Sequence, residues 1–507
     1  MRRPLVALLA VAALSACGST VPLSQQQAAS NATTGELSTT PGSTGGSTGL
    51  ACCGGGATGG ATGGTTGGSA TTGTTGAATT GDLGTTGATS GVVQGVTQKS
   101  IAIGFIYTVG RGEAAAALGA AGVTSGDEKA QWELLIKVVN TAGGLGGRQI
   151  KPVWYGEGGN NTQSISTQEA AACQAFTQDN HVALALSSFE FTNGFVDCMS
   201  RHGVPTSYSL ESINSSATYG KYPLQIEPTN MALDRQGRLL ADSLLRQDYF
   251  KAGTLGPAVN GIIAYDTPAY HAGVDALTKA LKAKGISVTD PRYIPFPNES
   301  ADTGRLAAAI SGAELAFASE RVDHVMFFDL NGLLSFLFMT NAQSQQYHPR
   351  YGLTSQSSGT HLADLLGGNA NAQLTGSVGV GWLPVLDLST ADYGPTKGSP
   401  ARKACRQIML KGGQQQGLSS PGAELVATGQ CDAMFTFQAV FQRLGSVVSG
   451  QAIRATLKGL GTSFPPASTF SVDFSGGRSD GVSAVRDMAY APSCSCFHYT
   501  SALHPVS

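Results

Sequence analysis

The sequence predicts an α/β protein with two lobes, each a mainly parallel sheet flanked by helices. All aromatic residues follow residue 96, so one body of 411 residues carries the material for a core. Within that body, short apolar, β-rich runs alternate with stretches of helical periodicity, which is typical of parallel sheets covered by helices. The alternation restarts near residue 229, which indicates a second unit of the same kind.

The first 16 residues are predicted to be a signal peptide. Met1-Arg2-Arg3 is positively charged, and the apolar run from Leu5 to Leu14 is too short to span a bilayer. The run ends in Leu14-Ser15-Ala16-Cys17, which resembles the lipobox of bacterial lipoproteins. That resemblance implies cleavage before Cys17 and acylation of its thiol and amine, which would hold the protein on a membrane surface. The alternative is an ordinary secretory signal that contains a cysteine.

Residues 17–97 are predicted to form a disordered stalk. From Gly18 to Val96, 22 residues are Gly and 20 are Thr, and only Glu36 and Asp82 are charged. Such a chain has no large side chains to bury and behaves as a flexible coil. We expect it to tether the folded body to the membrane. Cys52 and Cys53 lie in this stalk, either unpaired or in an intermolecular bridge.

Charge and motif content exclude several classes of function. The formal net charge is −2, with no run of Lys or Arg, so nucleic-acid binding has no electrostatic support. The folded part also lacks the H-E-x-x-H, G-x-S-x-G and phosphate-loop patterns of common enzymes. We therefore expect a protein that is not an enzyme and that holds neither a cofactor nor a metal.

The first α/β unit begins with the apolar run at 100–106. Its further strands are expected at 149–155, 181–186 and 204–209, and its helices at 125–139, 166–178 and 192–202. Residues 143–147 hold four glycines that close the first helix and precede a strand. A phosphate-binding loop opens a helix instead, so these glycines predict a C-cap and tight turn with positive φ rather than a nucleotide site.

The second unit follows the same order. Its helices are expected at 231–249, 268–284, 300–316 and 331–346, and its strands at 261–265, 287–294, 324–328 and 350–353. Thr267-Pro268 supplies an N-cap and a proline at the first helical position. Ligands of such sheets bind beside the carboxyl ends of the strands and the N-termini of helices.

The segment from Val139 to Ile150, VNTAGGLGGRQI, closely resembles the glycine turn of type I periplasmic binding proteins of the leucine/isoleucine/valine-binding branch. Segments 176–188, 266–273 and 470–480 resemble further pieces of that family in the same order. The resemblance covers about residues 98–491. It implies two lobes joined by three hinge crossovers, lobe one at 98–228 plus 384–455 and lobe two at 229–383 plus 456–507, which close on a small ligand.

The resemblance also implies which residues meet the ligand. On lobe one they follow the third and fourth strands: Ser187, Ser188, Phe189, Leu210 and Ser212. On lobe two they are Tyr270, Phe328, Asp329, Asn331 and Ser355. Three alternatives stay open. Ser187 and Ser188 could only cap the helix near Thr192, Asp329 could only cap the next helix, and Tyr270 could belong to the core.

One position departs from the amino-acid binders of this family. They usually hold the ligand ammonium with an acidic residue where this chain has the neutral Ser355. A buried ammonium without a counter-charge is costly, so a standard branched-chain amino acid fits only if Asp329 or Glu211 replaces that acid. Amides, urea-like compounds and carboxylates are the other ligand classes left open.

The folded body contains six cysteines, an even number that suggests disulfides in an exported domain. Pairing nearest neighbours in the sequence gives Cys173–Cys198, Cys405–Cys431 and Cys494–Cys496. This is one of the fifteen arrangements that six cysteines allow. The alternative for the last pair is a soft-metal site with His498 and His504.

Together these features predict a lipid-anchored protein on the outer face of the bacterial cytoplasmic membrane. Its expected role is to capture a small polar ligand and deliver it to the permease of an ABC importer. A sensor of the same fold that signals to a membrane partner, and a purely structural envelope protein, are the alternatives. Only the partner, which the sequence does not contain, separates transport from sensing.

Overall fold

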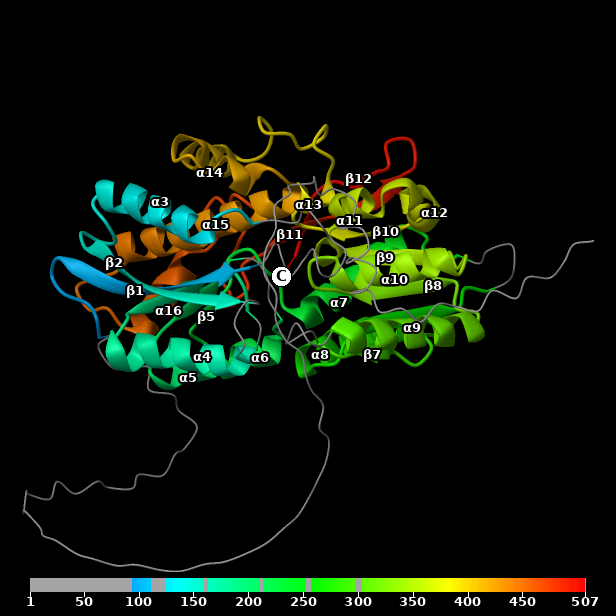
Figure 1. Ribbon diagram of the computed structural model, residues 1–507, viewed down its shortest axis with the longest axis horizontal. Helices are drawn as coiled ribbons and strands as arrows, with labels where there is room; N and C mark the ends of the chain where they lie inside the picture. The colour runs from blue at the N-terminus through cyan, green and yellow to red at the C-terminus, as the bar shows by residue number, and fades with distance from the viewer. Residues whose placement is uncertain are drawn as a thin grey trace, which may run out of the picture. The chain divides into compact units, whose positions relative to one another are not determined.

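The computed structural model describes residues 94–110, 125–158, 163–190, 192–209, 213–251, 257–296 and 303–506 (Figure 1). The predicted signal peptide, the lipobox with Cys17 and most of the predicted stalk, including Cys52 and Cys53, lie outside these residues. Leu210, Glu211 and Ser212 do as well. No helix in the described part of the chain has both the length and the hydropathy needed to cross a membrane.

The first sheet has five strands in the order β2-β1-β3-β4-β5. The strands are β1 (Ser100–Val109), β2 (Gln149–Gly158), β3 (Leu184–Ser187), β4 (Thr206–Tyr208) and β5 (Gln225–Ile226). Every neighbouring pair is parallel. The fold class predicted from the alternating pattern is therefore confirmed for this unit.

Helices cover both faces of the first sheet. They are α3 (Glu128–Thr141), α4 (Ile165–Gln174), α5 (Gly194–Arg201), α6 (Ser216–Lys221), α14 (Pro400–Lys411), α15 (Pro421–Arg443) and α16 (Gly450–Leu460). Alternate residues of β1 point to opposite faces. Phe105 packs in one core with residues of α3 and α15, and Ile106 packs in another with residues of α4 and α5. Figure 1 shows α3 and α15 on one side of β1 and β2, and α4 and α5 on the other. Burial on both faces explains why β1 is a continuous apolar run.

The second sheet has the order β12-β11-β10-β9-β8-β6-β7, with β13 paired to β11. Its strands are β6 (Asn260–Tyr265), β7 (Arg292–Ile294), β8 (His324–Phe328), β9 (Arg350–Thr354), β10 (Val378–Gly381), β11 (Ala484–Ala491), β12 (Cys496–Tyr499) and β13 (His504–Pro505). The strands from β6 to β10 pair in parallel, and β11, β12 and β13 add antiparallel pairs. The strand predicted at 287–294 was too long. β7 begins after Pro291, which has no N–H to give to a ladder.

The helices of the second unit also lie on both faces of its sheet. They are α7 (Leu233–Arg246), α8 (Pro268–Lys282), α9 (Thr303–Ser319), α10 (Leu333–Ser344), α11 (Gly359–Leu366), α12 (Ala370–Leu374) and α13 (Pro384–Asp387). Gly273 of α8 lies against Phe328, while the ring centroid of Phe338 in α10 is 5.4 Å from that of Phe327. Neighbouring residues of β8 thus face opposite helix layers, as a doubly covered sheet requires.

The chain passes between the two sheets after β5, after β10 and before β11. The exact lobe boundaries remain a proposal. The boundary expected at 455 falls inside α16, and Leu457, Leu460, Phe464 and Phe474 all belong to the core of the first sheet. Because these residues pack with β1 and α3, we propose that lobe one extends to about residue 474.

The glycine turn at 143–147 has the backbone that the sequence predicts. Gly143, Gly144, Gly146 and Gly147 have φ values of 102°, 79°, 55° and 82°. A Cβ on Gly144 would lie 2.0 Å from the carbonyl oxygen of Arg148. Only glycine combines this left-handed backbone with so close an approach. The segment is a helix-ending turn and not a phosphate loop.

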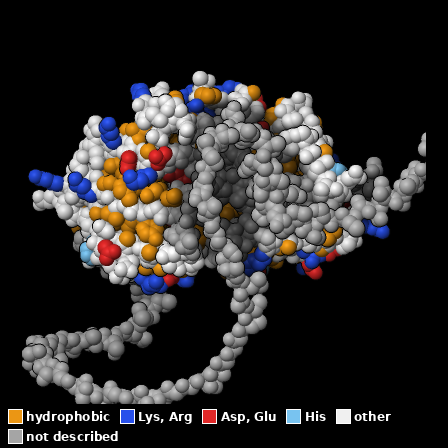
Figure 2. All heavy atoms as spheres, in the orientation of Figure 1, with side chains coloured by type: hydrophobic (Ala, Val, Ile, Leu, Met, Phe, Trp, Pro, Cys, Tyr) orange, Lys and Arg blue, Asp and Glu red, His pale blue; other side chains and the backbone are white. Residues whose placement is uncertain are grey.

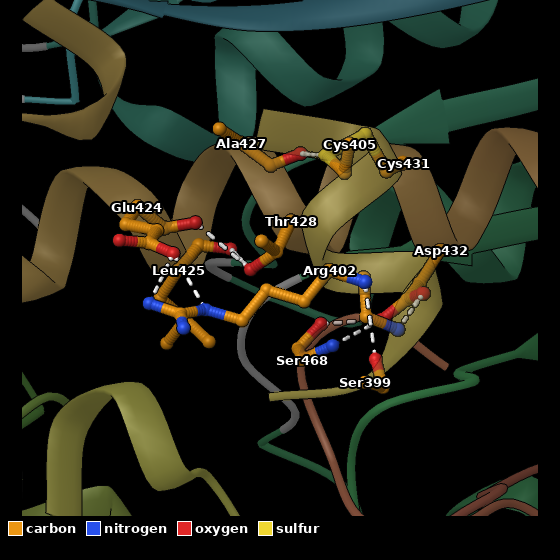
Figure 3. Close-up of a disulfide and its surroundings, with 11 residues drawn as sticks. Ser399, Arg402, Cys405, Glu424, Leu425, Ala427, Thr428, Cys431, Asp432 and Ser468 are labelled. Atoms are coloured by element: carbon orange, nitrogen blue, oxygen red, sulfur yellow. Dashed lines mark hydrogen bonds and ion pairs between the residues drawn. A yellow bond between two sulfur atoms is a disulfide. The ribbon is translucent and has the colours of Figure 1, made fainter. Parts of the chain in front are cut away.

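All three expected disulfides are present: Cys173–Cys198, Cys405–Cys431 and Cys494–Cys496. Cys405–Cys431 joins α14 to α15, beside an ion pair between Arg402 and Glu424 (Figure 3). The bridge between Cys494 and Cys496 rules against the soft-metal alternative, because a bridged sulfur is no thiolate ligand.

Graded reduction is expected to open Cys494–Cys496 first. This bridge closes one intervening residue and contributes only about 1.5 kcal/mol of loop entropy, against roughly 3.5 kcal/mol for the two longer loops. Cys494 is also exposed, whereas Cys173, Cys405 and Cys431 are buried. Alkylation and mass spectrometry after graded dithiothreitol treatment would check the order. Labelling of Cys405 at the same dose as Cys494 would contradict it.

Candidate functional site

Both sheets have a topological switch point, where neighbouring strands lead the chain in opposite directions. In the first sheet it lies between β1 and β3, and in the second between β6 and β8. Parallel sheets bind ligands outside the carboxyl ends of the strands at this point. The segment 187–190 begins with the last residue of β3, and the segment 328–331 begins with the last residue of β8. The residues predicted from sequence in these two segments therefore lie at the two switch points.

The serines after β3 do not cap α5. Ser187 Oγ donates to the carbonyl of Phe189 at 2.9 Å, and Ser188 Oγ accepts from Gln430 Nε2 of α15 at 3.2 Å. The N-terminus of α5 is held by Glu169 of α4, whose Oε1 accepts from the N–H of Thr192 at 2.9 Å. The structure therefore rules out the alternative that Ser187 and Ser188 cap α5.

Phe189 lies in the hydrophobic cluster that contains the second sheet. Its side chain is buried, and it shares this cluster with Met231 and Tyr270. The same cluster also holds Leu425 and Val426 of α15, so the loop after β3 packs into a core that both lobes share.

Tyr270 connects α8 to the loop after β8. It is wholly buried, and its hydroxyl donates to the carbonyl of Asp329 at 3.3 Å. Its ring centroid is 5.3 Å from that of Tyr265 at the end of β6. Tyr270 therefore supports the switch point from within the core, which was one of the alternatives left open.

Asp329 caps α10. Its Oδ1 accepts from the N–H groups of Leu330 and Leu334 at 2.6 and 2.9 Å, and its Oδ2 from the N–H of Ser335 at 2.8 Å. Burial raises the pKa of Asp329, and these hydrogen bonds work against that rise. Both oxygens are engaged, so a ligand cation would have to compete with the cap. Asn331, with φ 54°, forms the turn that leads into the helix.

Ser355 is also engaged within the protein. Its Oγ donates to Asp387 Oδ2 at 2.8 Å and accepts from the N–H groups of Trp382 and Leu383 at 2.7 and 3.1 Å. Tyr499 donates to the same Asp387 oxygen at 2.6 Å. Ser355 therefore fastens the second passage between the sheets to the loop after β9. Its neighbour Gln356 donates to Asn230 of the first passage at 3.4 Å.

Sequence reasoning missed a group of buried polar residues around β4 and β5. The group consists of Glu190, Tyr208, Asn214, Gln225 and Glu227. Asn214 and Gln225 each donate to both Glu190 and Glu227. The signal that could have found the group is Glu227, a glutamate directly after a strand. That strand, β5, has only two residues, so its alternation of polar and apolar residues cannot be recognised in the sequence.

The carboxyl end of the first sheet carries two buried acids whose pKa values are raised. Burial and the nearby Glu169 raise the pKa of Glu157 at the end of β2 to about 8. Burial also raises the pKa of Glu169 itself to about 7, against its hydrogen bonds from Thr192 and Phe195. Within the described part of the chain, no three His, Cys, Asp or Glu residues are grouped to hold a metal ion. This edge is suited to hydrogen bonding, because burial favours the uncharged form of both acids.

The face of the body shown in Figure 2 carries acidic and basic side chains interspersed with polar and hydrophobic ones. The described residues on this view form no basic tract that would follow a nucleic-acid backbone. The surface therefore agrees with the near-neutral formal charge of −2.

Comparison with known proteins identifies the fold. The family model described as "Periplasmic binding protein" matches residues 100–491. A solute-binding protein of an ABC transporter from R. palustris, solved with 4-hydroxybenzoate, is similar at a TM-score of 0.57 and 14% identity, over 80% of this chain and 97% of that one. A leucine-binding protein from Thermotoga maritima is similar at 0.54 and 14%, over 80% and 99%.

A fatty acid ABC transporter substrate-binding protein from Thermomonospora curvata is similar at a TM-score of 0.55 and 14% identity, over 81% of this chain and 94% of that one. No curated protein matches the sequence significantly. The family model spans most of the chain and agrees with the two doubly covered sheets. The chain therefore belongs to the type I periplasmic binding protein family, a solute-binding and non-enzymatic fold.

Proposed function

We propose that this protein captures a small polar ligand outside the cytoplasm and delivers it to the permease of an ABC importer. The observation that carries the proposal is the repeated switch point, at β1/β3 in one sheet and β6/β8 in the other. Two sheets with equivalent ligand-binding edges, joined by three passages, suit a trap that closes on a solute. The similar structures are named for leucine, 4-hydroxybenzoate and fatty acid, and these compounds indicate the size of ligand to test.

The polar groups near the first switch point favour a ligand that forms hydrogen bonds. Within the described residues, Ser209 Oγ, Asn230 Nδ2 and Gln430 Oε1 are buried and have no hydrogen-bond partner. The side chains of Asp329 and Ser355, by contrast, form their hydrogen bonds with other groups of the protein. A neutral polar group, such as an amide or a protonated acid, satisfies open atoms of this kind without burying a net charge.

The membrane anchor is part of the same proposal. Its support is the Leu14-Ser15-Ala16-Cys17 lipobox, followed by a Gly/Thr-rich tether. A lipid anchor would keep the trap near its permease, while the long flexible tether would let the body reach it. Metabolic labelling with a fatty acid would test this, with Cys17→Ser as the unlabelled control.

A thermal-shift screen of the full chain tests ligand capture. The compounds are L-leucine and other amino acids, acetamide, urea, 4-hydroxybenzoate and small carboxylates. A true ligand at 100 times its Kd should stabilise the protein by about 2.7 kcal/mol. Ser188→Ala should weaken the binding of that compound by roughly 1 kcal/mol, because the substitution removes one hydrogen-bonding hydroxyl.

Ser319→Ala is the matched control for the binding test, because Ser319 is exposed at the end of α9. It should leave the shift unchanged. Absence of any shift over the whole set of compounds would count against ligand capture. An equal loss in Ser188→Ala and Ser319→Ala would remove Ser188 from the site.

A further inference from the structure

Two buried glutamates share the same pair of hydrogen-bond donors. Gln225 Nε2 donates to Glu190 Oε2 at 2.9 Å and to Glu227 Oε1 at 2.8 Å. Asn214 Nδ2 donates to the same two oxygens, the one on Glu227 at 3.1 Å. The exposed fractions of Glu190 and Glu227 are 3% and 0%. Two carboxyl groups are thus held side by side, out of water.

The surroundings of Glu190 are acidic. Its remaining oxygen, Oε1, is buried without a partner, and no Lys, Arg or His among the described residues bonds to it. Tyr208 of β4 is wholly enclosed beside four carboxyl groups, those of Glu157, Glu169, Glu190 and Glu227. Two adjacent carboxylates in such a place cannot both be ionised without a large electrostatic cost.

The two arginines that bond to the third passage, Arg235 and Arg454, have their partners there. Arg235 of α7 pairs with Asp480 and donates to the carbonyl of Val482 at 2.9 Å. Arg454 of α16 bonds the carbonyl of Gly477 and the hydroxyl of Ser479. Neither has a hydrogen bond or ion pair with Glu190.

The two glutamates sit where the binding loop meets the hinge. Glu190 ends the segment that follows β3, and Glu227 begins the first passage to the second lobe. The backbone of Glu227 pairs with the third passage, since its N–H donates to the carbonyl of Ser479 at 2.8 Å and its carbonyl accepts from Gly481 at 2.9 Å. The carbonyl of Asn214 accepts from the N–H of Leu233, at the start of α7, at 2.9 Å.

We propose that Glu190 and Glu227 are positioning residues that share one proton, and that this proton holds the ligand-binding loop after β3 to the hinge. The inference rests on the proposed function for its meaning in binding. Removal of the proton leaves two negative charges on the same two amide donors. The loop then separates from the first passage, and ligand affinity falls.

The sign of the pH effect follows from the environment. Burial, and next the charge of Glu227, raise the pKa of Glu190 well above its usual range. The folded protein therefore holds this proton more tightly than the unfolded chain does, and the proton is lost as pH rises through the raised pKa. Stability of the contact between loop and hinge is full at low pH and declines as pH rises through the raised pKa.

Hydrogen–deuterium exchange of the full chain, without ligand, tests the shared proton. Between about pH 6 and about pH 9, after correction for the intrinsic rate, peptides covering 186–190 and 225–231 should exchange roughly tenfold faster. Glu190→Gln replaces the protonated carboxyl with a neutral amide of the same shape and should abolish the acceleration. Glu157→Gln is the matched control. Glu157 is equally buried at the same edge but has no bond to Asn214 or Gln225, so its variant should keep the acceleration in these two peptides, whatever it changes in overall stability.

A wild-type protein with no acceleration, or a Glu190→Gln variant that accelerates like wild type, overturns the proposal. Restoration of protection at about pH 9 by potassium or ammonium chloride, but not by choline chloride, also overturns it. The pair would then be a cation site. The ligand arm repeats the thermal shift with L-leucine and 4-hydroxybenzoate at both pH values. If neither compound nor any other in the screen binds, ligand capture fails while the exchange result stands by itself.

Discussion

Asp480→Ala is expected to lower the free energy of unfolding by about 3–5 kcal/mol, because it leaves a buried arginine without its counter-ion. Asp480 Oδ2 accepts from the guanidinium of Arg235 and from the N–H of Ala232 at 2.9 Å. The exposed fractions of Asp480 and Arg235 are 3% and 5%. This pair ties the start of α7 to the third passage, so its loss affects both lobes.

Chemical denaturation of the full chain, monitored by circular dichroism, measures the effect. The control is Glu133→Ala, which removes the exposed pair that Glu133 forms with Lys129. Exposed pairs contribute at most about 1 kcal/mol. If Asp480→Ala lowers the free energy of unfolding no more than the control does, Arg235 regains a hydrogen-bond partner or becomes hydrated in the variant.

The second large effect is a loss of stability as pH rises, opposite to the usual behaviour of proteins rich in salt bridges. Burial raises the pKa of Asp387 from 3.8 to about 7, although hydrogen bonds from Tyr499 and Ser355 oppose the rise. The folded state therefore binds this proton more tightly than the unfolded chain. Its contribution is full below about pH 4 and is lost as pH rises through 7, a change of about 4 kcal/mol. The raised pKa values of Glu157, Glu169 and Asp432, about 8, 7 and 6, act in the same direction.

Thermal unfolding between about pH 4 and about pH 8 checks this expectation, with Asp387→Asn as the informative variant. It should show a shallower decline than wild type. Asp473→Asn should leave the slope in place, because hydrogen bonds donated by Ser475 lower the pKa of Asp473, so this group does not bind its proton more tightly in the folded state. A wild-type protein that gains stability toward pH 8 would show that Asp387 ionises without penalty.

The parts of the fold that could be predicted from sequence are those set by local patterns. β8 has the bounds predicted for it, because the run from Val325 to Phe328 is apolar and aromatic and follows His324 directly. Such a short apolar run is typical of a buried strand. The glycine turn could be predicted because glycine readily adopts the positive φ that the turn requires. The disulfides could be predicted by pairing cysteines that are neighbours along the chain. In each case the deciding interaction spans few residues.

The roles of the site residues could not be predicted in the same way, because distant partners decide them. Ser355 is committed to Asp387, which lies 32 residues away. Ser188 meets Gln430 across 242 residues. The choice between cap and ligand contact for Asp329 depended on whether its oxygens reach the first turn of α10, which they do. The roles of Leu210 and Ser212 remain predictions.

The ladder between the first and third passages limits how the hinge can move. Besides the bonds of Glu227 to Ser479 and Gly481, the N–H of Val482 donates to the carbonyl of Asn230 at 3.4 Å. Two connected segments have to bend as one ribbon, so they behave as a single joint and not as two independent ones. Motion of one lobe relative to the other is thereby confined toward one rotation axis. A partner protein that binds either segment would therefore respond to the same angle between the two lobes.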